Sequence, residues 1–229
     1  MSNEIISYLD MCQREGTSLQ KGMNFQLNDD HSVILMSVRA NAPYQDRIED
    51  DGMTLIYEGH DEPRNATNSN PKSVDQPEFT SSGRLTENGK FHRAAQAHKL
   101  HGVAPESIRV YEKLRAGIWS YNGLFHLVDS WTQFEDGRKV FKFKLVAIDD
   151  HSISINSRIE NSERTRVIPT HVKLEVWKRD KGRCVTCGAT DELHFDHIIP
   201  YSKGGTSLKA ENIQLLCARH NLEKRDKLV

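Results

Sequence analysis

The stretch that decides the fold contains Cys184-Val185-Thr186-Cys187, then Asp196-His197-Ile198-Ile199-Pro200, then Asn212, and finally Cys217-Ala218-Arg219-His220-Asn221. A Cys-x-x-Cys turn points two thiolates in the same direction, which suits the tetrahedral coordination of zinc. Cys217 and His220 supply a second pair of ligands at the same spacing. We therefore expect a structural zinc ion held by four side chains, because so small a unit cannot build a sufficient apolar core alone. The four are Cys184, Cys187, Cys217 and His220.

The residues between and after the zinc ligands indicate a second, chemical site. Residues 211–224 are expected to form a helix, on which Cys217 and His220 share one face and Asn221 is rotated away from it by about 100°. Asp196 and Asn221 then offer oxygen ligands for a hard cation such as Mg²⁺. His197 is suited to take a proton from water near neutral pH. The alternative is a plain zinc knuckle without chemistry, which would not explain the Asp-His pair.

Over residues 177–227 the chain resembles the zinc-containing HNH (ββα-metal) endonucleases. The residues that carry the resemblance are Trp177-Lys178-Arg179-Asp180, the Cys184 to Cys187 turn, Asp196 to Pro200, Ser202-Lys203-Gly204-Gly205, Asn212, Leu215-Leu216-Cys217 and Asn221-Leu222-Glu223-Lys224. The resemblance implies that Asp196 and Asn221 bind a catalytic Mg²⁺ or Mn²⁺. It further implies that His197 is the general base and that Asn212 orients His197. Many relatives end in Cys-x-x-Cys, whereas His220 is the last ligand here and keeps the ligand count.

The charge of the chain is unevenly distributed. Residues 166–229 hold 12 Lys and Arg against 8 Asp and Glu, whereas residues 1–165 hold 19 against 24. A small basic unit suits contact with a polyanion such as DNA, although a solvated surface would have the same composition. Five cations of this unit are candidates to hold phosphates: Lys178, Arg179, Arg183, Lys203 and Arg219.

The first 150 residues have the pattern of a sheet with few helices, so an α+β fold is expected. Helical spacing predicts a helix within residues 1–16, and residues 86–101 predict a second helix closed by Gly102. Strands are expected at 32–38, 53–59, 108–114, 123–131 and 139–146, with a long polar loop at 61–83. The proposed division is therefore a first domain at 1–150, a polar linker at 151–166 and a nuclease domain at 167–229.

Several pieces of the first domain are similar to the SRA (SET- and RING-associated, or YDG) family. They are residues 51–60, Leu85-Thr86-Glu87-Asn88-Gly89, Ile108-Arg109-Val110 and residues 121–131. The resemblance implies a crescent-shaped, PUA-like curved β-barrel that flips a modified cytosine out of the duplex.

A flipped base needs aromatic faces for stacking and a polar group for its Watson–Crick edge. Trp119, Tyr121 and Trp131 lie near Asn122 in the sequence, and we expect these four residues to form the base pocket. The SRA family usually has Asp where this chain has Asn122. Packing in the core of the sheet is the alternative for the aromatic residues. Arg64, in the long loop, is a candidate to enter a DNA groove.

The cysteine content argues against a secreted disulfide framework. The four cysteines are Cys12, Cys184, Cys187 and Cys217, and three of them belong to the expected zinc site. The sequence has no signal-peptide pattern and no apolar run that could span a membrane. We therefore expect a cytoplasmic, bacterial protein with no membrane partner.

Together these features favour a modification-dependent, type IV-like restriction endonuclease. It would recognise 5-methylcytosine or 5-hydroxymethylcytosine in double-stranded DNA by base flipping, and would cut with a one-metal HNH site. Because each chain has one active site, cutting both strands favours a homodimer. One alternative is an HNH endonuclease that reads an unmodified sequence or structure. Another is a non-catalytic DNA-binding protein with a zinc-stabilised tail, which the intact Asp196, His197 and Asn221 disfavour.

Overall fold

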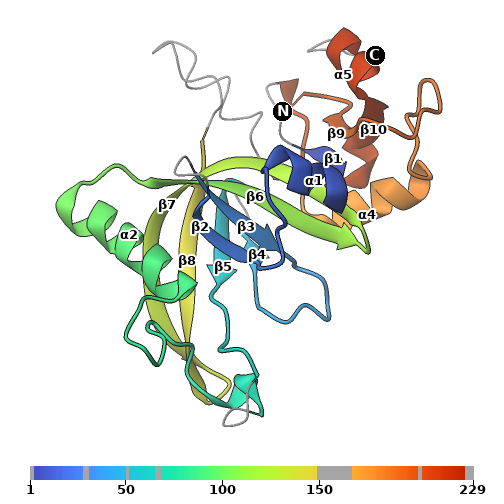
Figure 1. The fold of residues 1–229 in the computed structure, drawn as a ribbon. Helices are drawn as coiled ribbons and strands as arrows, with labels where there is room; N and C mark the ends of the chain where they lie inside the picture. Colours follow the sequence, from blue (N-terminus) through green and yellow to red (C-terminus); the bar gives the residue numbers. More distant parts are fainter. Residues whose placement is uncertain are drawn as a thin grey trace.

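The computed structural model describes residues 3–27, 31–49, 52–64, 69–148, 167–200 and 203–224, which form an α+β fold around one large, curved sheet (Figure 1). The expected linker at 151–166 lies outside these residues. The strands are β1 (Glu4–Ser7), β2 (Met23–Leu27), β3 (His31–Met36), β4 (Arg47–Ile48), β5 (Thr54–Glu58), β6 (Glu106–Arg115), β7 (Ile118–Glu135), β8 (Arg138–Ala147), β9 (Leu193–His197) and β10 (Ile213–Cys217). The helices are α1 (Tyr8–Arg14), α2 (Glu87–His101), α4 (Thr170–Arg179) and α5 (Ala218–Lys224), with 3₁₀ turns η1 (Pro71–Ser73) and η3 (Ala210–Asn212).

Strand β7 organises the sheet because it is 18 residues long and has three partners. β6 pairs along one edge of its first half, and β1 and then β8 pair along the other edge. The ladder with β6 shifts register between Val110 and Tyr111, and the ladder with β8 shifts between Leu127 and Asp129. Such irregularities bend and twist a strand, which accounts for the curvature of the sheet.

The remaining strands of the N-terminal unit extend the sheet on both sides of β7. β3 pairs in parallel with β6 and antiparallel with β2, while β5 joins β8 to β4. Helix α2, predicted at 86–101, packs against β2, β7 and β8 and buries Phe91 between Phe25 and Phe143. It begins at Thr86, whose Oγ1 accepts from the Gly89 N–H, and it ends at Gly102, whose φ of 67° favours glycine.

The first residues differ from the expected helix. Residues 4–7 form strand β1, and only Tyr8–Arg14 is helical. The helix begins at Ser7, whose Oγ caps the Asp10 N–H and so separates the two elements. Sequence periodicity could not show this, because the four preceding residues pair with β7, which lies more than 100 residues away in the sequence.

Strand β8 alternates lysine with apolar residues, a pattern typical of a strand with one solvated face. Lys142 is fully buried, and its Nζ lies 3.0 Å from Glu58 Oε2 and 2.8 Å from Glu135 Oε2. Burial of this cation is tolerated because two carboxylates pair with it. The alternation of lysine with apolar residues therefore indicates which residues share a face of the strand. It does not indicate whether the lysine face is exposed to solvent.

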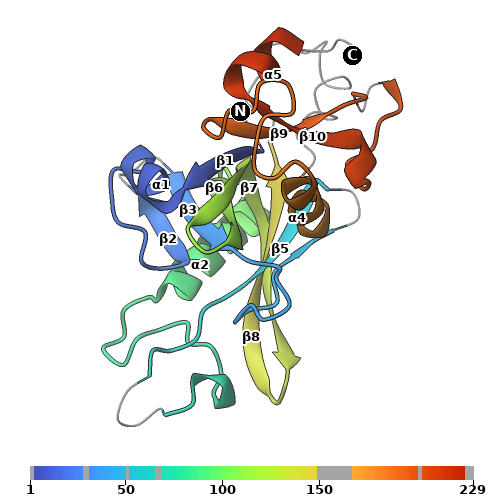
Figure 2. The same cartoon turned by 90° about the vertical axis from the view of Figure 1, so that its right-hand side faces the viewer.

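The C-terminal unit is built on the β9–β10 hairpin, with α4 and α5 packed against it (Figure 2). Its apolar cluster contains Val172 and Val176 of α4 and Leu193 and Phe195 of β9, together with Leu114 of β6. The hairpin also continues the large sheet, because β9 pairs with β1 and the strand order runs β10-β9-β1-β7.

Candidate active site and zinc centre

The β9–β10 hairpin places the chemical residues of the C-terminal unit. Asp196 pairs with Gln214 and His197 with Ile213, at the end of β9. The predicted helix at 211–224 is wrong in its first half: residues 210–212 form η3, residues 213–217 form β10, and only Ala218–Lys224 is helical. Cys217 therefore ends a strand and His220 lies in the following helical turn. The two ligands meet at this strand-to-helix corner rather than on one helix face.

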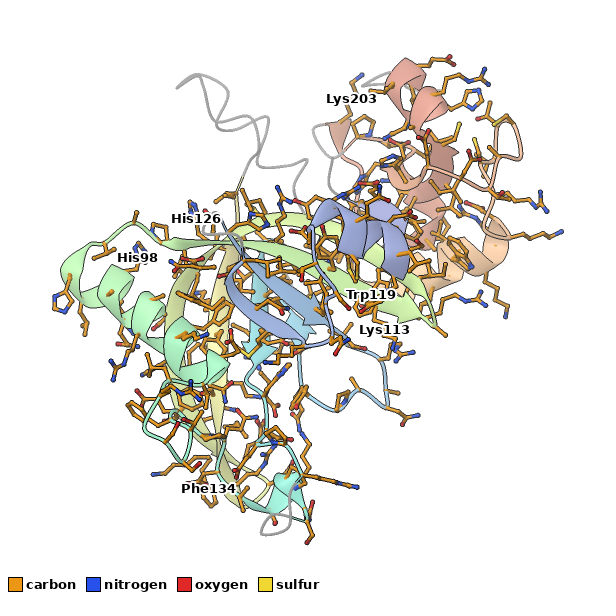
Figure 3. All side chains as sticks on the ribbon, in the orientation of Figure 1. His98, Lys113, Trp119, His126, Phe134 and Lys203 are labelled. Atoms are coloured by element: carbon orange, nitrogen blue, oxygen red, sulfur yellow. The ribbon has the colours of Figure 1, made fainter. Side chains whose placement is uncertain are left out.

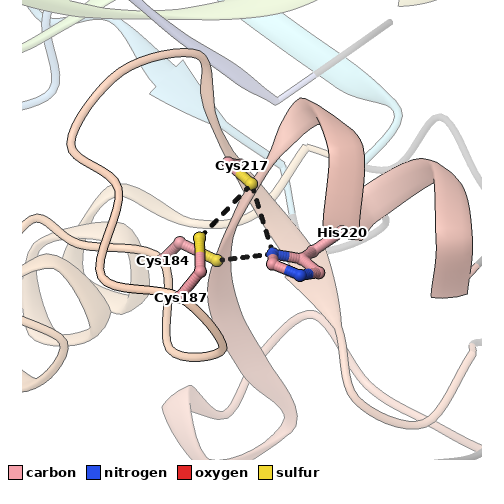
Figure 4. A group of neighbouring side chains, drawn as sticks. All are labelled: Cys184, Cys187, Cys217 and His220. Atoms are coloured by element: carbon pink, nitrogen blue, oxygen red, sulfur yellow. Dashed lines mark hydrogen bonds between the residues drawn. The ribbon is translucent and has the colours of Figure 1, made fainter.

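The four predicted zinc ligands converge (Figure 4). Their ligand atoms lie within 4.8 Å of one another. Cys187 Sγ is 3.9 Å from Cys217 Sγ, and His220 Nδ1 is 3.4 Å from Cys184 Sγ and 3.3 Å from Cys217 Sγ. Ideal tetrahedral zinc with ordinary bond lengths gives S···S separations of about 3.8 Å and S···N separations of about 3.6 Å. The cluster therefore fits a structural zinc ion that His220 would bind through Nδ1.

The surroundings of Cys184 favour the thiolate form that zinc requires, whereas the adjacent sulfurs of Cys184 and Cys217 raise the pKa of Cys187. Burial raises the pKa of Cys184, but backbone N–H groups at Cys217, Cys187 and Thr186 lower it more, and the pKa falls to about 6. A turn that directs several N–H groups at one sulfur stabilises negative charge there before a metal arrives.

Asp196 and His197 are held by side chains that the sequence analysis did not assign. Asp196 Oδ2 accepts from Lys224 Nζ at 2.5 Å and from Gln214 Nε2 at 3.1 Å. Lys224 also donates to the carbonyl of His197 and is itself buried. His197 Nε2 lies 2.8 Å from Ser207 Oγ. Burial lowers the pKa of His197, and Lys224 acts in the same direction against Asp196, so the ring is neutral at pH 7.

Asn221 lies in α5 directly after His220, and its side chain is half-buried. His220 Nδ1 contacts the sulfurs of Cys184 and Cys217, and Lys224 Nζ, four residues further along, contacts Asp196 Oδ2. Helix α5 therefore lies beside both the zinc ligands and Asp196. The metal-binding role expected of Asn221 stays a prediction.

Asn212 has a different role from the expected one. Its Oδ1 accepts from the Ile199 N–H at 2.8 Å, and its Nδ2 donates to the carbonyls of Ile199 and Thr206, each at 3.0 Å. Asn212 therefore closes the loop that follows β9, while Ser207 contacts the His197 ring directly. Gly205 is required in this loop, because a Cβ there would lie 1.8 Å from the Ile199 carbonyl oxygen.

The predicted phosphate-binding cations fall into two groups. Lys178, Arg183, Lys203 and Arg219 are exposed on the C-terminal unit, where Figure 3 marks Lys203. Arg179 is instead a structural clamp: its guanidinium pairs with Asp180 at 2.6 Å and donates to the carbonyls of Ala210 and Ile213. These contacts use the donors that a phosphate would need.

The structure does not gather the predicted base-pocket residues into a pocket. Trp119 and Tyr121 are each 8% exposed and pack with Ile6 and Met11 beneath α1. Figure 3 places Trp119 beside Lys113, whose Nζ lies 5.7 Å from the centre of the indole ring. Trp131 lies further along β7, opposite Lys142 on β8. The packing interpretation is therefore the one that the geometry supports for Trp119 and Tyr121.

Asn122 is likewise unsuited to reading a base, because it is 2% exposed and its amide is fully engaged. Its Oδ1 accepts from Lys173 Nζ at 2.7 Å, and its Nδ2 donates to Glu112 Oε2 at 3.0 Å. Lys173 belongs to α4, so Asn122 faces the C-terminal unit. Because the side chain of Asn122 is neutral, the Glu112 carboxylate is balanced by the Lys173 ammonium alone. An aspartate at position 122 would add a second buried negative charge.

A cavity of about 430 Å³ lies elsewhere in the N-terminal unit, beside Arg64. It is lined by Tyr44, Asp61, Glu62, Pro63, Arg64, Asn70, Pro71 and Lys72. The Tyr44 ring stacks on His60 with centroids 4.6 Å apart, and Lys72 Nζ lies 4.3 Å from the centre of the Tyr44 ring. The sequence signal for this site was weak, since a polar loop with one tyrosine upstream is common.

Asp61 is the buried acid of this cavity. Arg138 Nη1 donates to its Oδ1 at 2.6 Å, Gln76 Nε2 donates to the same oxygen at 3.2 Å, and Lys72 Nζ lies 3.0 Å from Oδ2. Burial raises the pKa of Asp61, but Arg138, Lys72 and Gln76 lower it more, so the carboxylate is ionised. The position of the Asp61 carboxylate is therefore set by three donors, two on Oδ1 and one on Oδ2.

Comparison with known proteins assigns the C-terminal site. Residues 184–227 match the HNH endonuclease family. This segment holds the zinc ligands and the Asp196–His197 pair, so it is an HNH endonuclease domain, and the protein belongs to the class of metal-dependent nucleases. The predicted nuclease assignment is thereby confirmed. No curated protein sequence matches the chain.

The comparison with solved structures finds similarity to the SRA domain of SUVH5 in complex with hemimethylated CG DNA. That domain is 21% identical, with a TM-score of 0.44, and the match covers 65% of this chain and 88% of that one. SUVH5 SRA bound to fully hydroxymethylated CG DNA is 23% identical, with a TM-score of 0.40 over 62% and 85% of the two chains. SUVH6 of Arabidopsis thaliana in complex with SAM is 19% identical, with a TM-score of 0.40 over 64% and 25%.

Within the described ranges, no helix is long and apolar enough to cross a bilayer.

The zinc assignment predicts the outcome of removing one ligand. Cys217→Ser should lower the bound zinc from one ion per chain to a small fraction, because a hydroxyl is a poor zinc ligand and the site has no spare donor among the four. The purified protein's metal content and thermal unfolding would measure the change. Cys12→Ser is the matched control, since Cys12 belongs to α1 and not to the cluster of ligands, and it should keep full zinc. Full zinc content in Cys217→Ser would contradict the assignment.

Proposed function

We propose that the protein is a modification-dependent DNA endonuclease, in which the N-terminal unit reads 5-methylcytosine or 5-hydroxymethylcytosine and the HNH domain cuts the phosphodiester backbone. The observation that carries the proposal is the pairing of an HNH site with a separate cavity that combines an aromatic ring, a fixed carboxylate and cations. Restriction of modified phage DNA in a bacterial cytoplasm is the biological role that this combination suits.

The cavity supports base recognition by its chemistry. A flipped cytosine presents an aromatic face for stacking and an N4 amine that donates to an acceptor. The Tyr44 ring stacks on His60, and Lys72 Nζ lies over the ring, so a base that stacks on Tyr44 would take the place of the Lys72 ammonium. The carboxylates of Asp61 and Glu62 offer acceptors. Arg64 and Lys72 line the same cavity and provide charge for the flanking phosphates. This site replaces Trp119, Tyr121, Asn122 and Trp131 as the proposed base pocket.

His197 is the proposed general base of the cutting site. When Nε2 carries the proton and donates to Ser207 Oγ, the lone pair of Nδ1 is left to accept a proton from the attacking water. A pKa lowered by burial keeps the ring neutral at pH 7, which is the form that a base needs.

Asp196 and Asn221 are the proposed ligands of the catalytic divalent ion. Both described donors to Asp196, Lys224 and Gln214, reach Oδ2, so Oδ1 is the oxygen available to a cation. A single bound Mg²⁺ or Mn²⁺ would polarise the scissile phosphate and stabilise the negative charge that develops there. Lys178, Arg183, Lys203 and Arg219 lie on the surface of the same unit and are proposed to contact DNA phosphates.

Cutting both strands requires either two chains or two successive events, because each chain carries one HNH site. We propose a homodimer on DNA, which would present one HNH domain to each strand. Sedimentation of the protein with and without a duplex would show whether two chains assemble.

The function is tested by digestion of three matched duplexes that carry cytosine, 5-methylcytosine or 5-hydroxymethylcytosine, in the presence of Mg²⁺ or Mn²⁺. We expect cleavage of the modified duplexes and little cleavage of the unmodified one. Equal cleavage of all three would instead favour an HNH endonuclease that recognises an unmodified sequence or structure. No cleavage with either metal would favour a non-catalytic DNA-binding protein.

The base assignment predicts that His197→Ala lowers the cleavage rate by roughly 10²- to 10⁴-fold, the usual contribution of a general base. Zinc content and affinity for the modified duplex should not change, because neither the zinc ligands nor the cavity includes His197. Quenched-flow or gel assays with saturating protein would measure the rate. Undiminished cleavage by a zinc-loaded His197→Ala protein would remove His197 from the mechanism.

The proposed pocket predicts that Tyr44→Ala weakens binding of the modified duplex by roughly 5- to 150-fold, since stacking on an aromatic ring is worth about 1–3 kcal/mol. Binding of an unmodified duplex should change little. Trp131→Phe serves as the comparison on β7, and fluorescence anisotropy would measure both variants. Loss of modified-DNA binding in Trp131→Phe but not in Tyr44→Ala would return the pocket to β7.

A further inference from the structure

The two units of the chain are joined by backbone pairing as well as by sequence. Strand β1 lies between β7 of the N-terminal unit and β9 of the HNH domain (Figure 2). Glu4 pairs with Tyr121 on one side and with His194 on the other, and the Phe195 N–H donates to the Asn3 carbonyl at 3.0 Å. A shared strand restricts rotation of one unit against the other, because its hydrogen bonds are directional.

Next to this strand, a buried polar cluster joins α4 of the HNH domain to β6 and β7. Lys173 Nζ lies 2.7 Å from Glu112 Oε2 and 2.7 Å from Asn122 Oδ1. Thr170 Oγ1 donates to the other oxygen of Glu112. Lys173 and Glu112 are 0% exposed, Asn122 is 2% exposed and Thr170 is 7% exposed. Every member of the cluster is thus removed from water and satisfied by the others.

The charges of the cluster are balanced by these contacts alone. Burial lowers the pKa of Lys173, and Glu112 opposes that shift, which is the pattern of a cation that depends on one carboxylate. The neutral amide of Asn122 bridges the pair without adding charge. Apolar contacts surround the cluster, since Leu114 of β6 and Ile5 of β1 pack with the core of the HNH domain.

Such a junction fixes orientation more tightly than an apolar seam. Apolar surfaces can slide with little loss of burial, whereas a buried ion pair loses its partners on small displacements and has no water to replace them. The junction uses none of the zinc ligands, none of the proposed catalytic residues and none of the residues that line the cavity.

We propose that Lys173, Glu112 and Asn122 form a rigid joint that sets the distance between the recognised base and the cleaved phosphate. This inference rests on the proposed function for its DNA readout. It makes the three residues determinants of the cut position, with no part in the chemical step. The length of the chain segment between the units would then have no influence on where the DNA is cut.

The joint itself is tested without DNA. Spin labels on Leu100→Cys in α2 and Leu208→Cys in the HNH domain, in a zinc-loaded Cys12→Ser background, report the distance between the units; both leucines are exposed. We expect a single narrow distance distribution. Asn122→Asp should broaden it, because two buried carboxylates would face one ammonium. Asn122→Asp combined with Glu112→Gln restores one carboxylate and should narrow it again. A broad distribution with Asn122 and Glu112 intact would overturn the joint.

The effect on cutting is tested by sequencing the ends of a long duplex that carries one modified cytosine. The unaltered protein should cut at one position on each strand or at adjacent positions. Asn122→Asp should spread the cuts over about one helical turn, roughly 10 bp, and the double variant should restore the single position. Insertion of Gly-Ser-Gly-Ser between residues 157 and 158 should leave the position of the cut unchanged. This experiment alters no buried residue, so its outcome does not depend on whether a substituted core still folds.

Two results would overturn the inference about cutting. One is a cut position that moves or spreads with the inserted residues, which would make the connecting segment the ruler. The other is a folded, zinc-loaded Asn122→Asp protein with the unaltered cut position. Cleavage that ignores the modified base would refute the proposed function instead, and the distance between the spin labels would still decide whether the joint is rigid.

Discussion

The backbone hydrogen bonds of β7 are the constraint on which the rest of the structure depends. This strand pairs with β6 on one edge and with β1 and β8 on the other, so it sets the positions of the strands that pair with it directly. Its two register shifts bend the sheet, and the bend separates the end that carries β1 from the end that carries the β8 hairpin. The HNH domain is attached near the first end, whereas Arg138, which holds Asp61 of the cavity, begins β8 at the other.

Polar groups are held together differently in the zinc-ligand cluster of the HNH domain and in the ion pairs of the N-terminal unit. In the HNH domain three thiols and an imidazole converge on one point, and a zinc ion of the expected size would cross-link strand β10, helix α5 and the Cys184 turn. In the N-terminal unit the charged groups compensate each other, with Lys142 between Glu58 and Glu135, and Asp61 among Arg138, Gln76 and Lys72. The first arrangement depends on a metal for its stability, and the second depends on the alignment of strands far apart in the sequence.

The sequence predicted what local rules decide. The α2 helix and its end at Gly102 followed from residues 86–102, and the four zinc ligands followed from two Cys-x-x-Cys-like spacings. Predictions from the sequence were wrong where the position of a residue depends on a contact with a distant part of the chain. The spacing of Cys217 and His220 is equally compatible with a helix face and with a strand-to-helix corner, and only pairing with β9 selects the latter. Asn122 was assigned to a base from its aromatic neighbours in the sequence and from the SRA resemblance. Its partner Lys173 lies 51 residues away and in the other unit, so local sequence could not indicate the contact. Ser207 and Lys224 were missed because each acts through a contact made only after the chain folds.

The position of β1 has a consequence for how such a protein can be recombined. The core of the HNH domain includes Leu114 and Ile5, and its sheet is bordered by a strand from the beginning of the described chain. A chimera that takes only the residues after the connecting segment from another protein would keep Leu114, Ile5 and β1 of the original protein. These residues would then face an HNH domain that does not match them. An exchange of the HNH domain would therefore have to keep Leu114, Ile5 and strand β1 together with it, because their contacts complete its core and its sheet.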